Sequence, residues 1–327
     1  MRVVSGIQPT GNLHLGNYLG AIKQWVAMQD AMKSGEECLF FLADLHALSQ
    51  PLVAAELASN TIEMAATLLA CGIDPDRSIL FNQARVPAHS ELAWILGGTA
   101  RMGWLNRMTQ WKDKAGKSGE SQSVAMFTYP VLQAADVLLY QATHVPVGAD
   151  QAQHVELTRD LAERFNRRYG EVFTLPRAIH PPTAARVMDL ATPESKMSKS
   201  IDSPGTIFLL DPVDVVRRKI MRAVTDSGTS VTYDPESKPG VSNLLAILSA
   251  CTQTPVEDLS PGSYGALKKE TADAVIALLE PLQREYAYLS ADPATLEAIL
   301  RTGAERAREQ AAGTVTAAKE AMGLLAA

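Results

Sequence analysis

The sequence predicts an α/β protein, in which a parallel sheet forms the N-terminal part and a helical portion follows. Short runs of β-branched and aromatic residues alternate with segments of helical periodicity in this N-terminal part. Such alternation is typical of parallel strands joined by crossover helices. After Pro204 the strand signals fade and helical patterns remain. The fold class is therefore α/β, with a second part that is α-helical.

Each element is predicted by its own pattern. The predicted strands are apolar runs bounded by turn residues, at 2–6, 38–43 and 78–82. The predicted helices carry apolar residues at helical spacing, at 16–32, 53–70, 88–96, 211–224, 241–251, 264–289 and 295–321. We expect three parts: a sheet domain at 1–190, a mobile loop at 191–205 and a helical domain at 206–327.

The composition is that of an ordinary globular protein, with 46% apolar residues, 20% charged residues and a net charge of -6. The three cysteines are widely spaced and form no Cys-x-x-Cys pair, which favours a reducing cytoplasm over disulfides or a zinc site. We find no apolar stretch long enough to span a membrane and no secretion signal. We expect a cytoplasmic protein that holds no metal of its own.

Residues 6–20 predict a strand end, a tight turn and the start of a helix. Free N–H groups at a helix start attract anions. Gly16 would let a ligand approach the backbone, and His14 and Asn17 would supply side-chain donors. The pattern favours a phosphate site. A surface histidine beside an ordinary helix start is the alternative interpretation.

A second segment places Lys196 and Lys199 three residues apart among small hydroxyl residues. Lysines on a mobile loop can close onto the phosphates of a nucleotide and stabilise charge that moves during a reaction. An isolated pair of lysines would more often lie in a solvated surface turn. Together with the phosphate site at residues 6–20, this pair indicates phosphoryl or nucleotidyl transfer.

The two segments resemble the nucleotide motifs of the class I aminoacyl-tRNA synthetases, usually written HIGH and KMSKS. The second motif is complete as Lys196-Met197-Ser198-Lys199-Ser200, whereas the first stands as His14-Leu15-Gly16-Asn17, with Asn in the last position. Further stretches resemble the tryptophanyl enzymes of this class, at 6–21, 107–114, 145–154 and 156–166. The resemblance covers essentially the whole chain.

The resemblance implies a Rossmann-like catalytic domain that binds ATP and tryptophan, and a helical domain that binds the tRNA anticodon. It implies that L-tryptophan is activated with ATP and Mg²⁺ and transferred to tRNA(Trp), by a homodimer. Contacts with ATP are implied for Gln8, His14, Gly16, Asn17, Gly148, Asp150, Lys196, Met197, Ser198 and Lys199. Contacts with tryptophan are implied for His46, Tyr129, Gln133, Asp136 and Gln151. Catalytic charge stabilisation is implied for Lys196, Lys199 and Lys114.

Three polar residues bear on the choice of amino acid. Tyr129, Gln133 and Asp136 are spaced i, i+4 and i+7, so they share one face if the segment is helical. Asp136 could then accept a hydrogen bond from an indole N–H or a phenol O–H, and the other two could bind the ammonium group. An Asp and a Gln that satisfy nearby backbone groups are the alternative.

Other functions stay open at this point. Tyrosyl-tRNA synthetases resemble the chain in carrying Gln at the position of Gln133, so tyrosine is the second candidate substrate. A small-molecule nucleotidyltransferase would share the phosphate site but would not need the long helical part. A non-catalytic RNA-binding relative would lose the lysines or Asp136. Two basic clusters are either RNA contacts or solvated helix faces: Arg164, Arg167 and Arg168, and Arg217, Arg218, Lys219 and Arg222.

A first prediction concerns the lysine loop. Replacing Lys199 with Ala should lower the rate of adenylate formation by about two to three orders of magnitude, because a preorganised positive charge is lost. The dissociation constant of tryptophan should change much less. Single-turnover kinetics with ATP and tryptophan measure both quantities, and an unchanged rate would remove Lys199 from the mechanism.

Overall fold

The computed structural model describes residues 1–115, 122–148, 152–179, 186–198 and 203–325. It contains one parallel sheet of five strands in the order β3-β2-β1-β4-β5. The strands are β1 (Arg2–Ile7), β2 (Glu37–Leu42), β3 (Ile79–Asn82), β4 (His144–Pro146) and β5 (Arg177–Ile179). The chain builds outward from β1 to β3, then returns to the other side of β1. Ligands bind at such a reversal, beyond the carboxyl ends of the strands.

Helices connect the strands and then form the C-terminal part. Those up to β5 are α1 (Leu15–Asn17), the π-helical turn η1 (Tyr18–Ile22), α2 (Lys23–Ala31), α3 (Asp44–Ala47), α4 (Ala54–Ala70), the 3-10 turn η2 (Gln83–Arg85), α5 (Ala88–Gly97), α6 (Met102–Leu105), α7 (Thr109–Ala115), α8 (Val124–Leu138) and α9 (Ala152–Tyr169). Those after β5 are α10 (Val213–Met221), α11 (Pro239–Thr252), η5 (Val256–Asp258), α12 (Tyr264–Ser290) and α13 (Pro293–Ala321).

Alternate residues of β1, β2 and β3 point into two separate cores. Val3, Phe40 and Leu80 face a core that also contains residues of α2, α4 and α10–α12. Val4 and Phe81 face the second core, which contains residues of α5, α8, α9 and α13. Because both faces of the sheet are covered, its strands are apolar on both sides, as expected for a parallel sheet.

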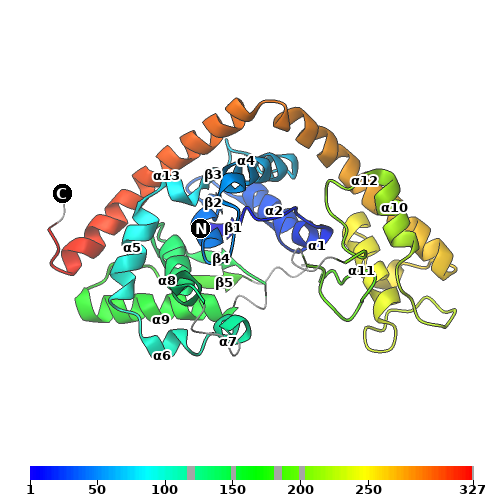
Figure 1. Ribbon diagram of the computed structural model, residues 1–327, viewed down its shortest axis with the longest axis horizontal. Coiled ribbons are helices and arrows are strands. Elements are labelled where there is room, and N and C mark those ends of the chain that lie inside the picture. Colours follow the sequence, from blue (N-terminus) through cyan, green and yellow to red (C-terminus); the bar gives the residue numbers. More distant parts are fainter. Residues whose placement is uncertain (116–121, 149–151, 180–185, 199–202, 326–327) are drawn as a thin grey trace.

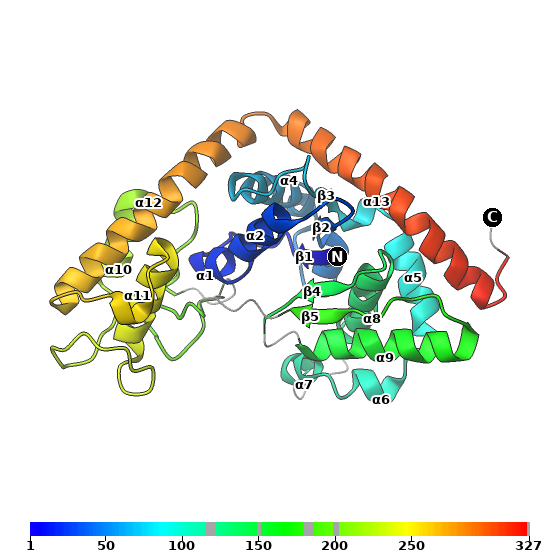
Figure 2. The ribbon, with the colours of Figure 1, turned by 180° about the vertical axis from the view of Figure 1, so that it is seen from behind.

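The C-terminal helices form an arch over the molecule. Figures 1 and 2 show that α12 and α13 meet at an angle, with α12 running to α10 and α11 and α13 returning across the sheet domain. The returning helix packs on β3 and α5. Gly303 makes this approach feasible, because a Cβ atom there would collide with the backbone of Leu80.

The predicted elements agree closely with the observed ones. Every strand and helix expected at the sequence level is present, with ends that differ by a few residues. The sequence analysis did not identify β4 and β5, each of three residues. It also assigned α13 to a separate helical domain, whereas this helix shares a core with the sheet. None of the described helices is long and apolar enough to cross a membrane.

Two glycines of α13 allow a matched test of this packing. Gly303→Ala should destabilise the fold by about 1–3 kcal/mol, because the helix must move away from β3. Gly313→Ala should stabilise it by about 0.5–1 kcal/mol, since a methyl group there meets open space and alanine favours a helix. Urea unfolding of both variants measures the difference. Equal stability of the two variants would contradict the packing of α13 on β3.

Candidate active site

The two nucleotide-motif segments are joined by backbone hydrogen bonds. The N–H of Leu15 donates to the carbonyl of Ile207 at 2.8 Å, and the N–H of Leu209 donates to the carbonyl of Leu13 at 2.9 Å. Residues 207–209 follow the lysine loop and precede α10. The helix start at α1 and the exit of the loop therefore lie side by side, beyond the carboxyl end of β1.

The motif residues His14, Gly16 and Asn17 support one another. His14 Nδ1 accepts from the backbone N–H of Asn17 at 3.2 Å, and Asn17 Oδ1 accepts from the backbone N–H of His14 at 3.2 Å. This is a reciprocal capping box. A Cβ atom on Gly16 would lie only 3.1 Å from the His14 ring. Gly16 thus makes room for His14, a role that the sequence analysis did not anticipate.

The lysine loop begins from a short antiparallel stem. Met188 and Lys196 form an isolated bridge, and the N–H of Met197 donates to the carbonyl of Val187 at 3.1 Å. The amide of Asn243, on α11, bonds both backbone groups of Met188 at 2.9 Å. The stem is therefore attached to the C-terminal helices as well as to the helix start.

The predicted ATP-binding residues of the lysine loop differ in their exposure to solvent. Lys196 is exposed and Ser198 is half-buried. Met197, expected to border the adenine, is only 1% exposed and packs in the first core. It anchors the stem, and a contact with adenine would require this packing to open. Lys199 lies outside the described residues.

The carboxylate of Asp136 lies at the centre of a buried network on the face of α8. Its Oδ1 is 2.6 Å from Nε2 of Gln83 and 2.7 Å from Nδ1 of His89. Its Oδ2 is 2.7 Å from Nε2 of His46. His89 is fully buried, and its Nε2 lies 2.7 Å from the hydroxyl of Tyr140. The predicted pair of His46 and Asp136 is thus in direct contact.

Gln83 and His89 are site residues that the sequence analysis missed. Gln83 follows β3 directly, at the edge where ligands bind in such sheets, and this position was the available signal. His89 lies in the first turn of the apolar helix α5, where no spacing pattern marks it. The carbonyl oxygen of Gln83 is buried and has no hydrogen-bond partner among the described residues.

A second buried carboxylate holds the strand ends in place. Asp44 Oδ2 accepts from the side-chain amide of Asn82 at 2.7 Å, and Asp44 Oδ1 accepts from the backbone N–H of Ala84 at 2.8 Å. Asp44 lies two residues before His46, and these partners flank Gln83. This arrangement fixes the two segments that bring His46 and Gln83 to Asp136.

The network sets the charge on Asp136. Burial alone would raise the pKa of this carboxyl, but the contacts with His46 and His89 outweigh burial and lower the pKa to about 2. An ionised carboxylate only accepts hydrogen bonds, so both imidazoles donate to it. The other ring nitrogen of His89, Nε2, lies against the hydroxyl of Tyr140, whose pKa is raised by burial. A carboxylate offers about four acceptor positions. The described residues occupy three of them, two on Oδ1 and one on Oδ2.

Tyr129 connects this network to α9. Its ring packs edge-on to the ring of His46, with centroids 6.2 Å apart. Its hydroxyl donates to Oε1 of Gln110 at 2.8 Å and lies 2.9 Å from Nε2 of His154. Burial raises the pKa of Tyr129 to about 12, so it remains a neutral donor. His154 on α9, to which the sequence analysis assigned no role, thus contacts a predicted substrate residue.

The remaining predicted residues lie after two strands, on two helices or outside the described residues. Gln8 follows β1 directly and Gly148 comes two residues after β4, so both lie at the carboxyl ends of neighbouring strands. Gln133 is half-buried on α8, and Lys114 lies on α7. Asp150 and Gln151 fall outside the described residues. The roles of all six in binding or catalysis stay predictions, as does that of Ser198.

A prediction follows from the lowered pKa of Asp136. A carboxyl with a lowered pKa in the folded state stabilises the fold above its ordinary pKa, and this stabilisation is lost as the pH falls toward about 2. His89→Phe removes one donor, so the pKa should rise and the stabilisation should be lost at a higher pH. Unfolding free energies between pH 3 and 7 measure the shift.

His144→Gln, at a partly buried histidine outside this network, is the control and should keep the pH dependence of the wild type. His89→Phe should also lower stability at neutral pH by about 1–3 kcal/mol, because the buried hydroxyl of Tyr140 loses its hydrogen-bond partner. Identical pH profiles for the two variants would exclude His89 as a determinant of the charge on Asp136.

Comparisons with known proteins agree with this geometry. A model of the family described as "tRNA synthetases class I (W and Y)" matches residues 1–280. The chain is similar to "Tryptophan--tRNA ligase 1" of Streptomyces avermitilis, with 51% identity over 330 residues that cover 99% of each chain.

Solved structures show the same relationship. A tryptophanyl-tRNA synthetase from Mycoplasma pneumoniae has a TM-score of 0.89 at 34% identity, covering 99% of this chain and 98% of that one. The enzyme from Campylobacter jejuni, complexed with ADP and tryptophan, has a TM-score of 0.80 at 35% identity, covering 99% and 100%. Motifs, sheet topology and whole-chain similarity agree, and the chain belongs to the tryptophanyl-tRNA synthetases of the class I aminoacyl-tRNA synthetase family.

Proposed function

We propose that this chain activates L-tryptophan with ATP and transfers the activated amino acid to the 3′ end of tRNA(Trp). The observation that carries the proposal is the buried Asp136 carboxylate, which has one acceptor position left, on Oδ2. An indole N–H is a single donor attached to a large apolar ring. It matches an acceptor of this kind at the edge of an apolar core.

The energetics favour a substrate that donates to this position. A buried charge loses water, and an analogue without a donor leaves that loss uncompensated. The side-chain oxygen Oε1 of Gln83, which has no hydrogen-bond partner among the described residues, adds a second buried acceptor beside Asp136. Phenylalanine offers no ring donor, so it should be rejected on this ground. Tyrosine offers a hydroxyl but would fill a pocket made for indole poorly.

The reaction consists of two transfers. A carboxylate oxygen of tryptophan attacks the α-phosphorus of ATP, and the bond from that phosphorus to pyrophosphate breaks. A ribose hydroxyl of the tRNA then attacks the acyl carbon, and AMP leaves. Neither step requires a protein nucleophile, so positioning and charge stabilisation dominate. ATP would enter as its magnesium complex, with the ion held mainly by the phosphates.

The residues of the nucleotide motifs would perform this stabilisation. We assign the phosphates to the start of α1 and to Lys196 and Lys199, with Lys114 as a third cation. The support is the direct pairing of residues 13–15 with residues 207–209, which brings the loop exit to the helix start. Gln8 and Gly148 would contact the nucleotide beyond the carboxyl ends of β1 and β4.

Each of the three parts of the chain would have its own function. We propose that residues 1–190 bind ATP and tryptophan, that residues 191–205 close over the phosphates, and that the helices after residue 206 bind the anticodon of the tRNA. The attachment of Asn243 on α11 to the loop stem supports communication between the last two parts.

Tyrosine is the weaker alternative substrate. Gln133 is the residue that made tyrosine a candidate substrate. The relatives that match the whole chain at 50–51% identity are, however, named tryptophan--tRNA ligases. The same whole-chain similarity disfavours a small-molecule nucleotidyltransferase. A non-catalytic relative is disfavoured because the lysines and Asp136 are retained.

A pyrophosphate-exchange assay with all twenty amino acids tests the proposed activity. Tryptophan should be preferred over tyrosine in kcat/KM by at least roughly a hundredfold, and Asp136→Ala should lose about 2–4 kcal/mol of that preference. A wild type that prefers tyrosine would overturn the assignment. A preference that survives Asp136→Ala would place selectivity elsewhere.

We also propose a homodimer, because an exposed apolar surface favours association between copies. Trp94 on α5 is 86% exposed, and Met102 on α6 is 67% exposed. Light scattering at micromolar concentration should give twice the chain mass, and Trp94→Glu should reduce it. Tyr288→Glu, at another exposed aromatic residue, is the control and should leave the mass unchanged. A monomeric wild type that charges tRNA fully would contradict the dimer.

A further inference from the structure

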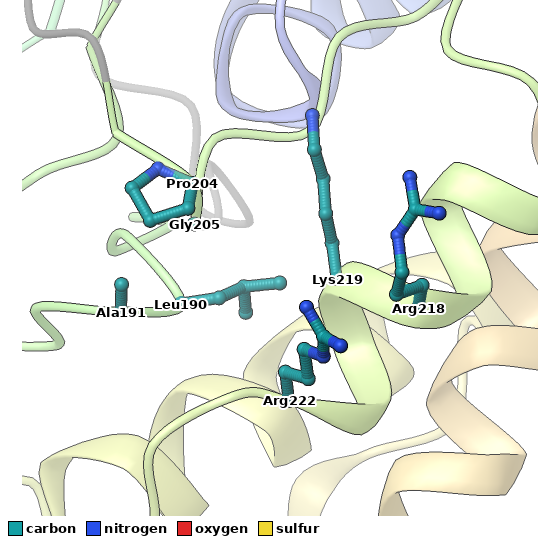
Figure 3. Close-up of a pocket in the computed structure, with 7 residues that line it drawn as sticks. All are labelled: Leu190, Ala191, Pro204, Gly205, Arg218, Lys219 and Arg222. Atoms are coloured by element: carbon teal, nitrogen blue, oxygen red, sulfur yellow. The ribbon is translucent and has the colours of Figure 1, made fainter.

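A cavity of about 400 Å³ lies at the base of the lysine loop, apart from the tryptophan network. One side consists of Leu190, Ala191, Pro204 and Gly205, where the chain enters and leaves the loop. The other side consists of three cationic side chains of α10 and its C-cap: Arg218, Lys219 and Arg222. Figure 3 shows these cations on the helix that faces Leu190 and Gly205.

The charges on this helix are compensated unequally. Arg217 forms an ion pair with Asp273 at 2.7 Å, on the exposed side of α10. Lys219 donates to Asp211 Oδ2 and to the carbonyl of Thr206, both at 2.7 Å. Arg218 and Arg222 form no ion pair or hydrogen bond with a side chain of the described residues. Uncompensated charge is therefore confined to the two arginines that line the cavity.

The location of Arg218 and Arg222 at the C-terminus of α10 explains part of why two arginines without an ion pair are found there. Cations there interact favourably with the helix dipole, although by less than about 1 kcal/mol at an exposed site. Arg218 and Arg222 are four residues apart, where two like charges repel. An anion placed between the guanidinium groups would remove this repulsion, and a phosphate can accept two parallel hydrogen bonds from each group.

We propose that this cavity binds a phosphate of the tRNA backbone through Arg218 and Arg222. The identity of the polyanion rests on the function proposed above. The other lining side chains are Leu190, Ala191, Pro204 and the already bonded Lys219, so the cavity offers no set of groups for reading a base. A contact of this kind positions RNA without regard to sequence.

One wall of the cavity is formed by the two ends of the lysine loop, so a phosphate bound there would also contact the loop. The N–H of Leu190 donates to the carbonyl of Gly205 at 3.2 Å, which closes the base of the loop. The carbonyl of Leu190 accepts from the N–H of Val224, just after α10. Lys219 binds Thr206 on the same segment. A phosphate held by α10 would therefore lie against both ends of the lysine loop.

The test uses the full chain with Arg218 and Arg222 both replaced by Gln. The KM for tRNA in aminoacylation should rise about tenfold, and the salt dependence of tRNA binding should fall by about one unit of slope. Tryptophan-dependent pyrophosphate exchange without tRNA should change less than twofold. Arg217→Gln, on the same helix but paired with Asp273, is the matched control and should leave all three quantities unchanged.

Two results would overturn the proposal. An unchanged KM and salt slope would exclude a phosphate contact. A loss of exchange that parallels the loss of tRNA affinity would assign the arginines to the phosphates of ATP instead of RNA. If wild type shows no tryptophan-dependent exchange, the proposed function fails, and filter binding of tRNA to wild type and variant still decides the role of the arginines. Thermal unfolding and the single variant Arg218→Gln verify that the fold is retained.

Discussion

A buried carboxylate must be surrounded by donors, and this requirement organises the active-site end of the molecule. Asp136 is 1% exposed, and an unpaired charge at that depth would be strongly destabilising. Its donors come from segments that follow two different strands, at His46 and Gln83, and from the start of α5, at His89. The network therefore ties β2, β3, α5 and α8 together and fixes their relative positions. Among the described residues, these donors occupy three of the roughly four acceptor positions of the carboxylate, and we propose that the substrate uses the fourth.

The nucleotide end is organised by backbone pairing. The start of α1, the stem of the lysine loop and the segment before α10 share one apolar core and exchange backbone hydrogen bonds. Met197 and Leu15 are buried in that core, so the stem is held while Lys196 remains exposed. A charged loop whose stem is packed in an apolar core can move its cations toward a ligand while the stem itself stays in place.

The sequence patterns were sufficient for long elements and for residues within motifs. Helical periodicity located α4, α12 and α13, and the i, i+4, i+7 spacing placed Tyr129 and Asp136 on one helix face. Strands β4 and β5 have three residues each, too few for an alternation pattern to be recognisable. Gln83 and His89 meet Asp136 across about fifty residues of chain, so their contacts arise from tertiary packing alone. Met197 shows what a motif does not reveal, because its side chain packs in the core, and its expected contact with ATP stays a prediction.

We propose that an indole N–H completes the hydrogen bonding of Asp136 Oδ2. The most direct test replaces only that donor: isothermal titration with tryptophan and with its benzothiophene analogue, in which sulfur replaces the indole N–H. The account predicts that the analogue binds at least roughly a hundredfold more weakly, because the buried acceptor loses its partner while the ring size is nearly unchanged. Equal affinities would show that Asp136 does not recognise the indole, and would contradict the account.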